Sequence, residues 1–206
     1  MTKIVVITAG TGNPSSSRLL GERLADASVA ALRDAGVPAE VMHLELRTLA
    51  VELANHLATR LPGTALREAF DEVCSADGVI AVTPVFNGSY SGLFKLFLDA
   101  LDEGAMQGRP VLLAATGGTA RHSLVIEHAM LPLFYYLKAL VATHPVFAAT
   151  KDWGTAGGKL EKRIRRAAEA FAQLVLGANP AKGDDDFEVV DFADLLSPPT
   201  HNQPSG

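Results

Sequence analysis

The chain has 206 residues, of which 48% are hydrophobic and 20% are charged, a composition typical of one folded globular domain. Basic and acidic side chains are equal in number over residues 1–180, so the net charge of −5 arises entirely in residues 181–206. A balanced body disfavours nucleic-acid binding through a generally basic surface. One cysteine excludes an internal disulfide and a multi-thiolate metal site. Because we find neither a basic-then-apolar leader nor a run of about 18 apolar residues that would span a membrane, we expect a soluble, cytoplasmic protein.

Short β-branched apolar runs alternate with amphipathic stretches along residues 1–176. The apolar runs predict strands over residues 3–8, 39–44, 78–83, 110–115 and 140–148. The amphipathic stretches predict helices over residues 18–35, 46–76 (in two pieces broken at 61–63), 93–101, 123–138 and 158–176. Strands of this kind that alternate with helices are typical of a parallel sheet buried on both faces. We therefore predict an α/β fold: a doubly wound, five-stranded parallel sheet with helices on both faces.

The composition changes at Gly177, after which proline, glycine, aspartate and serine predominate. We expect one domain over residues 1–180 and an acidic tail over residues 181–206. Within the tail, only residues 187–192 and Leu195-Leu196 are apolar enough to dock on the body.

Three predicted loops follow strands of the sheet, over residues 9–18, 84–92 and 116–122, and all are rich in glycine and small hydroxyl residues. In an open parallel sheet, ligands bind outside the carboxyl ends of the strands. The loops therefore predict a ligand site at this edge.

The first loop combines Gly10 and Gly12 with serines at the start of a helix. Glycine lets the backbone approach a ligand, and the amide groups and dipole of a helix N-terminus favour a phosphate. The loop lacks the Gly-Lys-Ser/Thr of a Walker loop and the third glycine of a Rossmann fingerprint. Capping of the helix by Ser15 or Ser16 is the alternative interpretation.

The second and third loops have the residues to hold a flat heterocycle. Phe86 and Tyr90 offer apolar faces, or else they pack inward as part of a plain strand-to-helix turn. The third loop offers the backbone amides of Gly117 and Gly118, and His122 either contacts a ligand or is a structural or surface histidine.

Other motifs are absent or ambiguous. No Gly-x-Ser-x-Gly elbow is present, and the remaining histidines lack metal-ligand spacing, so we expect no hydrolase triad and no metal site. A basic cluster on the last predicted helix is a solvated face or an acceptor for the acidic tail; it comprises Lys159, Lys162, Arg163, Arg165 and Arg166.

Three segments are distinctive: Ala9-Gly10-Thr11 with its serine-rich loop, residues 83–95 (TPVFNGSYSGLFK), and Ala115-Thr116-Gly117-Gly118. Together they resemble the NADPH-dependent FMN reductase family, and the resemblance extends over about residues 1–176. The similarity is greatest to reductases that supply reduced flavin to luciferase-like or alkanesulfonate monooxygenases. The resemblance implies a flavodoxin-like sheet, FMN as cofactor and NADPH or NADH as hydride donor. Asn13-Pro14 departs from the serine or arginine pattern of many relatives.

The resemblance also implies where FMN lies. Its phosphate would contact Ser15, Ser17, Arg18 and Leu19, and its ring would lie over Pro84, Val85, Phe86 and Asn87, with Thr116, Gly117, Gly118 and His122 on the other side. Gly10 and Tyr90 complete the expected cofactor-binding set, and Arg121 is a candidate contact for a nicotinamide-nucleotide phosphate. We expect no catalytic side chain, because the hydride passes between the two cofactors.

The function expected from this resemblance is NAD(P)H-dependent FMN reduction, with reduced FMN delivered to a flavin-dependent monooxygenase. One alternative is an NAD(P)H:quinone or azo-dye reductase that retains FMN. The other alternative is a non-enzymatic flavodoxin-like electron carrier or flavin-binding module. The electrically neutral body of the chain disfavours this alternative. Apolar surface on helices 93–101 and 123–138 and the resemblance suggest a homodimer or homotetramer, whereas deep burial within one domain is the alternative.

Overall fold

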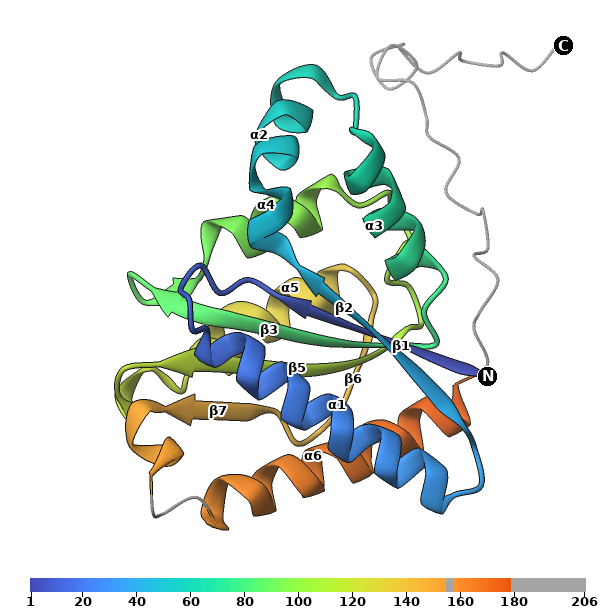
Figure 1. Ribbon diagram of the computed structural model, residues 1–206, viewed down its shortest axis with the longest axis vertical. Helices are drawn as coiled ribbons and strands as arrows, with labels where there is room; N and C mark the ends of the chain where they lie inside the picture. Colours follow the sequence, from blue (N-terminus) through green and yellow to red (C-terminus); the bar gives the residue numbers. More distant parts are fainter. Residues whose placement is uncertain (155–157, 179–206) are drawn as a thin grey trace, which may run out of the picture.

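Seven strands form one mostly parallel sheet in the computed structural model, which describes residues 1–154 and 158–178 (Figure 1). The sheet order is β2-β1-β3-β5-β6, with β4 paired to β3 and β7 paired to β5. The strands are β1 (Thr2–Thr8), β2 (Ala39–Glu45), β3 (Gly78–Phe86), β4 (Ser89–Tyr90), β5 (Pro110–Gly117), β6 (Leu140–Val141) and β7 (Val146–Ala149). The predicted α/β architecture with a doubly wound sheet is confirmed.

The predicted count of five strands is wrong, for two local reasons. The expected strand over residues 140–148 is divided: β6 pairs with Pro110 and Val111 at the start of β5, and β7 pairs with its end. Pro145 lies between the two pieces and lacks the N–H that a continuous ladder needs. The other addition is β4, which folds back antiparallel on β3.

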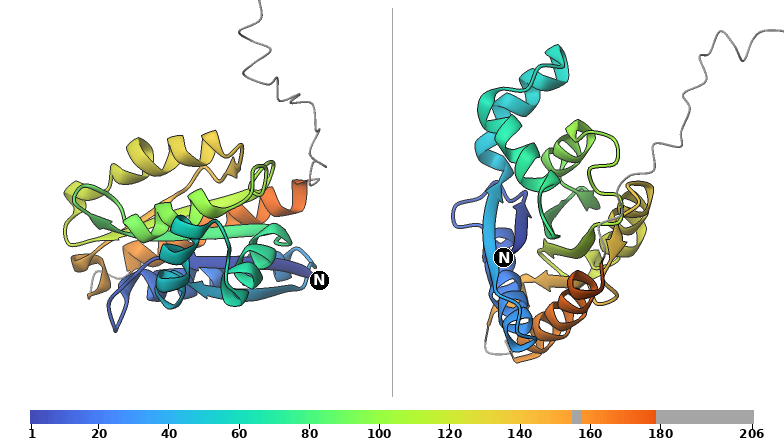
Figure 2. Two further views of the ribbon diagram at one scale, coloured as in Figure 1. Left: turned by 90° about the horizontal axis from the view of Figure 1, so that it is seen from above. Right: turned by 90° about the vertical axis from the view of Figure 1, so that its right-hand side faces the viewer.

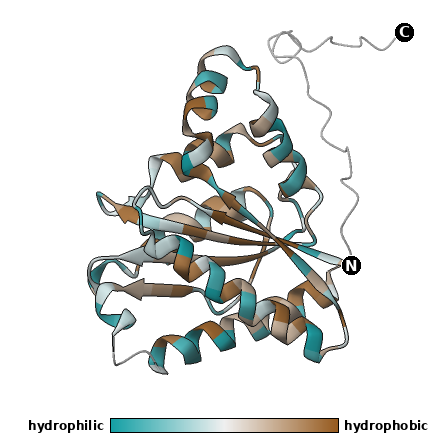
Figure 3. Ribbon diagram, viewed as in Figure 1, coloured by the Kyte–Doolittle hydropathy of each residue, from teal (hydrophilic) through white to brown (hydrophobic). Residues whose placement is uncertain are grey.

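The helices lie on both faces of the sheet, as predicted. Helices α1 (Ser16–Asp34) and α6 (Gly158–Gly177) cover one face, and α4 (Gly92–Ala100) and α5 (Leu131–Tyr136) lie on the other (Figure 2). Alternate residues of the buried strands point to the two layers: Ile4 and Val6 contact the α1/α6 side, whereas Val5 and Ile7 contact the opposite core. The central strands β1, β3 and β5 are accordingly hydrophobic over most of their length, whereas the edge strand β2 is mixed (Figure 3).

The segment between β2 and β3 has the predicted break. It contains η1 (Leu46–Leu49), α2 (Ala50–Thr59) and α3 (Thr64–Cys74). Arg60 closes α2 with a left-handed backbone (φ 61°), and Pro62 follows it.

The expected continuous helix over residues 123–138 is instead composite. It consists of the π-helical turn η3 (Ile126–Met130) followed by α5, with the short η2 (Ala120–His122) before them. Pro132 directly follows the π-helical turn within this continuous helical run, and because proline has no N–H it cannot donate a hydrogen bond to a carbonyl of the preceding turn. One further short helix, η4 (Thr150–Trp153), links β7 to the region of α6.

The two helices expected to carry surplus apolar surface differ. Phe94 and Phe97 of α4 are fully buried in the domain, so the burial alternative holds for that helix. On α5, Tyr135 and Tyr136 remain 61% and 84% exposed. No helix among the described residues is long and apolar enough to cross a membrane. The tail segments 187–192 and 195–196 lie outside the described residues.

Candidate functional site

The carboxyl ends of β1, β3 and β5 lie side by side, and the three glycine-rich loops leave the sheet there (left end of the sheet in Figure 1). Thr8 is in register with Val82, and Pro84 with Thr116. A buried hydrogen bond of 2.8 Å joins Ser17 Oγ to Thr116 Oγ1, which are 99 residues apart in sequence. The loops that the sequence marks as ligand-binding therefore meet at one edge.

The first loop ends at the N-terminus of α1. Ser15 is the N-cap residue, and its Oγ accepts a hydrogen bond of 3.2 Å from the Arg18 amide, so the capping interpretation is confirmed for this serine. A Cβ atom at Gly10 would overlap Ser15 Oγ, so only glycine lets the strand end approach the cap this closely. The backbone N–H groups of Ser16 and Ser17 lie in the first turn of the helix, where no intrahelical carbonyl is available to accept from them. The loop therefore presents helix-terminal N–H groups in a tight cradle.

The Arg18 guanidinium is engaged by two carboxylates. Its Nε donates to Glu22 (2.8 Å) and its Nη1 to Glu45 (2.6 Å) at the end of β2. The hydrogen bond to Glu22 and the negative charges of Glu45 and Glu22 raise the pKa of Arg18 above its ordinary value. Leu19 is 40% exposed beside it. Of the four residues expected near a phosphate, Ser15 and Ser17 lie at the start of α1 in the cradle, and the Arg18 guanidinium is already bonded to Glu22 and Glu45.

The second loop is a β-hairpin, which was not predicted. Val85 pairs with Tyr90 and Phe86 with Ser89, leaving a two-residue turn in which Asn87 (φ 49°) and Gly88 (φ 83°) have positive φ angles. Asn-Gly is the preferred sequence for such a turn, so this dipeptide was the signal available in the sequence.

The hairpin directs its two aromatic residues differently. Phe86 is 46% exposed, so the expected alternative that it packs inward is wrong. Tyr90 is partly buried, and its ring lies 6.0 Å from that of Phe94. Thr83, which sequence reasoning did not single out, fixes the start of the hairpin: its buried hydroxyl accepts from the Ser91 amide (3.0 Å) and donates to the Pro84 carbonyl (3.0 Å).

The third loop rests on β7. A Cβ atom at Gly117 would lie 2.9 Å from Phe147 Cζ and 3.6 Å from His122 Cβ, so the absence of a side chain lets the loop sit directly on the phenyl ring. A Cβ at Gly118 would meet nothing within 4 Å, which leaves its backbone open. His122 lies against the loop, whereas Arg121 is exposed and bonds to Thr119 Oγ1 (3.1 Å).

The site thus consists of backbone amides, hydroxyls and one exposed aromatic ring. Among the residues that the structure describes, no three His, Cys, Asp or Glu side chains gather to hold a metal ion. Such a site suits the binding and orientation of a planar, phosphorylated ligand that brings its own chemistry. The edge fits FMN in that respect: helix-terminal amides for a phosphate lie next to an exposed ring and open backbone for a heterocycle.

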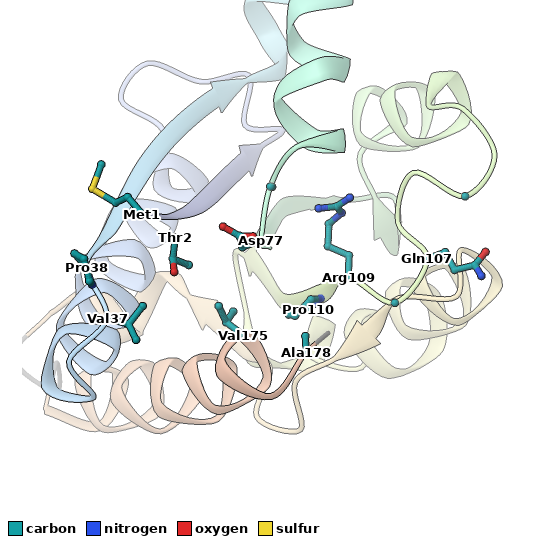
Figure 4. Close-up of a pocket in the computed structure, with 13 residues that line it drawn as sticks. Met1, Thr2, Val37, Pro38, Asp77, Gln107, Arg109, Pro110, Val175 and Ala178 are labelled. Atoms are coloured by element: carbon teal, nitrogen blue, oxygen red, sulfur yellow. The ribbon is translucent and has the colours of Figure 1, made fainter. Parts of the chain in front are cut away.

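A cavity of about 540 Å³ lies at the opposite, amino end of the sheet (Figure 4). The Arg109 side chain points into it and is held by the carbonyl oxygens of Cys74 (2.8 Å) and Ala105 (3.1 Å). Burial lowers the pKa of Arg109. Ligands of open α/β sheets bind at the carboxyl edge, so this cavity is distinct from the site formed by the three loops.

Comparison with known proteins agrees with the geometry. The model of the NADPH-dependent FMN reductase family matches residues 2–154. An FMN reductase (NADPH) of Pseudomonas aeruginosa is 37% identical over 178 residues, covering 85% of this chain and 93% of that protein. An NADH-dependent FMN reductase, SfnE of Pseudomonas putida, is 37% identical over 186 residues, covering 86% and 94%.

Solved structures show the same fold. An oxidoreductase from Corynebacterium diphtheriae superposes with a TM-score of 0.84 at 41% identity, covering 87% of this chain and 99% of that one. A flavodoxin, WrbA-like protein from Agrobacterium tumefaciens superposes with a TM-score of 0.62 over 87% of this chain and 100% of that one, at 16% identity. The fold is therefore flavodoxin-like, and the chain belongs to the NADPH-dependent FMN reductase family.

Proposed function

We propose that FMN binds across the three loops at the carboxyl edge, with its phosphate at the N-terminus of α1 and its isoalloxazine ring between the β3–β4 hairpin and the loop after β5. The activity is that of the family: the chain is an NAD(P)H-dependent FMN reductase. One observation carries the location of the site, namely the buried Ser17–Thr116 hydrogen bond that joins the phosphate loop to the ring loop.

The phosphate is held mainly by backbone groups in this proposal. The amides of Ser16 and Ser17 point out of α1, and the helix dipole adds a favourable field for a dianion. Ser15 caps the helix and Gly10 gives it room, so both shape the cradle. The Arg18 guanidinium, held by Glu22 and Glu45, acts at longer range or orients the loop.

The ring is held by the hairpin and the third loop. Pro84, Val85, Phe86 and Asn87 line one side, with Tyr90 behind them, and Thr116, Gly117, Gly118 and His122 line the other. When bound, FMN accepts a hydride from the nicotinamide, and the protein's part is to stack and orient the two rings. Thr83 keeps the hairpin in place through its two hydrogen bonds.

We propose further that FMN exchanges with solvent and leaves in its reduced form for a flavin-dependent monooxygenase. The walls favour exchange, because Phe86, Asn87, Gly88 and Gly118 are all exposed. A buried prosthetic flavin would require more enclosing side chains. We expect this exchange to take place in the cytoplasm.

We also propose that the chain forms a homodimer or a homotetramer. The exposed large apolar side chains of the η3–α5 region, Leu124, Tyr135 and Tyr136, support a contact there.

A purification and assay test the function. We expect apoprotein to oxidise NADPH or NADH, followed at 340 nm, at a rate that rises and saturates with added FMN. A protein that purifies yellow, keeps its flavin on dialysis and reduces quinones without added FMN would instead be the prosthetic-flavin reductase. Failure to oxidise either nucleotide with FMN, FAD or a quinone would overturn the assignment of reductase activity.

A further inference from the structure

A second cavity lies beside the proposed flavin site; its walls are mostly apolar, and four basic side chains are among the residues that line it. Its volume is about 460 Å³. It is lined by Ala120, Ser123, Phe147, Lys151, Asp152, Lys159, Lys162 and Arg163. These residues come from the end of the third loop, from β7 and η4, and from the first turns of α6.

Two of the charged residues form the wall of this cavity. Arg163 Nη1 donates to the Phe147 carbonyl (2.5 Å), and its Nη2 lies 3.1 Å from Asp152 Oδ2. The same carboxylate oxygen accepts a hydrogen bond from the Ala149 amide (2.9 Å). The Asp152 and Arg163 charges therefore offset each other and tie α6 to β7.

The three lysines carry the surplus positive charge. Lys151, Lys159 and Lys162 form no salt bridge with any residue in the described part of the chain, and the one carboxylate that lines the cavity, Asp152, is engaged by Arg163. Two other cations of the region do have partners: Arg165 lies 3.9 Å from Glu169, and Arg23 lies 2.8 Å from Glu161. The three lysines are exposed residues that line this cavity and have no salt-bridge partner among the described residues, so their charges favour a multiply charged anion bound there.

The position of the cavity indicates which anion. The sheet order puts the phosphate loop at the end of β1, the ring loops at the ends of β3 and β5, and this cavity at the end of β7. Phe147 supports Gly117 of the ring loop and also lines the cavity. A dinucleotide whose nicotinamide stacks on the ring would thus extend its adenosine half toward the cavity, away from the FMN phosphate.

We propose that this cavity binds the adenosine 2′-phosphate of NADPH and makes the enzyme prefer NADPH to NADH. The inference rests on the proposed FMN reductase function. A phosphate monoester carries close to two negative charges at neutral pH, more than either phosphate of the pyrophosphate, which suits several lysines. The Phe147 ring and the aliphatic stems of the lysines give the neighbouring ribose and base an apolar wall.

The kinetic test compares Lys159→Gln/Lys162→Gln with Arg165→Gln, which changes the charge of the same helix outside the cavity. We expect kcat/KM for NADPH to fall about tenfold or more in the double variant and kcat/KM for NADH to stay within about twofold. Arg165→Gln should leave both values unchanged. Equal losses for the two nucleotides, or no loss for either, would overturn the proposal.

A binding test separates this proposal from the reductase function. Isothermal titration with adenosine 2′,5′-bisphosphate and with 5′-AMP needs neither flavin nor turnover. We expect the bisphosphate to bind more tightly to the wild-type chain and the difference to disappear in the double variant. If the two probes behave in this way but the protein does not reduce FMN, the proposed function is contradicted and the 2′-phosphate site is still supported. Equal affinity of the wild-type chain for both probes, as expected if the acidic tail fills the cavity, would overturn the 2′-phosphate site.

Discussion

The hydrogen bond between Ser17 and Thr116 is the residue-scale link between the phosphate loop and the ring loop. Ser17 is 1% exposed and lies in the first turn of α1. We expect Ser17→Asp to weaken FMN binding about tenfold or more, because a carboxylate would face the phosphate at short range. Fluorescence titration of FMN measures this.

Ser17→Asn is the matched control, since it has nearly the same size as aspartate and no charge. We expect its loss of FMN affinity to be clearly smaller. If the two variants bind FMN equally well, the phosphate does not lie at this helix terminus. Urea unfolding of both variants checks that the buried position tolerates the larger side chain.

Phe86 and Phe94 are separated by eight positions in sequence and lie in different environments. Phe86 is 46% exposed at the hairpin, whereas Phe94 is fully buried. We expect Phe86→Ala to raise the KM for FMN several-fold with a change in unfolding free energy of about 0.5 kcal/mol. Phe94→Ala should cost about 3–5 kcal/mol through the cavity it leaves. An unchanged KM in the Phe86 variant would place the flavin ring elsewhere.

At the scale of elements, the contact between β7 and α6 depends on Asp152. Partial burial raises the pKa of this carboxyl, but the Ala149 amide, Arg163 and Lys151 outweigh it and lower the pKa below its ordinary value. A lowered folded-state pKa stabilises the fold above the unfolded-state pKa, and this contribution disappears as the pH falls through the folded value.

We therefore expect Asp152→Asn to lower the unfolding free energy by about 1 kcal/mol at pH 7 and by less at a pH below the ordinary aspartate pKa of about 3.9. Urea unfolding at both pH values measures the difference. Glu169→Gln, which disrupts a 3.9 Å pair between exposed side chains, should change little at either pH. A loss for Asp152→Asn that is equal at the two pH values would mean that its charge is not responsible.

The elements that sequence predicted well are those whose pattern is local. The apolar run of β1 and the 3.6-residue periodicity of α1 mark buried surfaces directly, and both elements lie within two residues of the prediction. The elements that were missed depend on backbone hydrogen bonding. The last predicted strand is divided at Pro145 into two pieces that pair with opposite ends of β5, and its apolar pattern alone does not show this division.

The candidate site shows the same distinction. Chain order and the rule that ligands bind at the carboxyl edge were enough to bring the three loops together. The direction of the Arg18 side chain was not predictable, because its partner Glu45 comes from the end of another strand. The basic cluster on α6 was visible in the sequence, but its cavity also needs Phe147 and Ser123 from distant segments.

At the scale of the whole molecule, the apolar side chains on the η3–α5 region make assembly testable. Tyr136 is 84% exposed, and we expect Tyr136→Asp to convert the proposed dimer or tetramer to smaller species without loss of stability, because a carboxylate would be buried at the proposed contact. Light scattering after size-exclusion chromatography measures the mass. Leu57→Asp, at a 60% exposed position on α2, is the control and should leave assembly intact. A monomeric wild-type chain would exclude the proposed contact.

The distribution of charge leads to the last prediction. The excess negative charge of −5 belongs to residues 181–206. The family match ends earlier, at residue 154, and 87% of this chain is enough to cover 99% of the Corynebacterium diphtheriae oxidoreductase. We therefore expect a chain ending at residue 180 to keep kcat/KM for NADPH at saturating FMN within about twofold of the full chain at 150 mM salt. At low salt, its KM for NADPH should be lower than that of the full chain, because the acidic tail repels an anionic nucleotide and salt screens this repulsion. An inactive truncated protein that is still folded by circular dichroism would show that the tail forms part of the site or of the assembly.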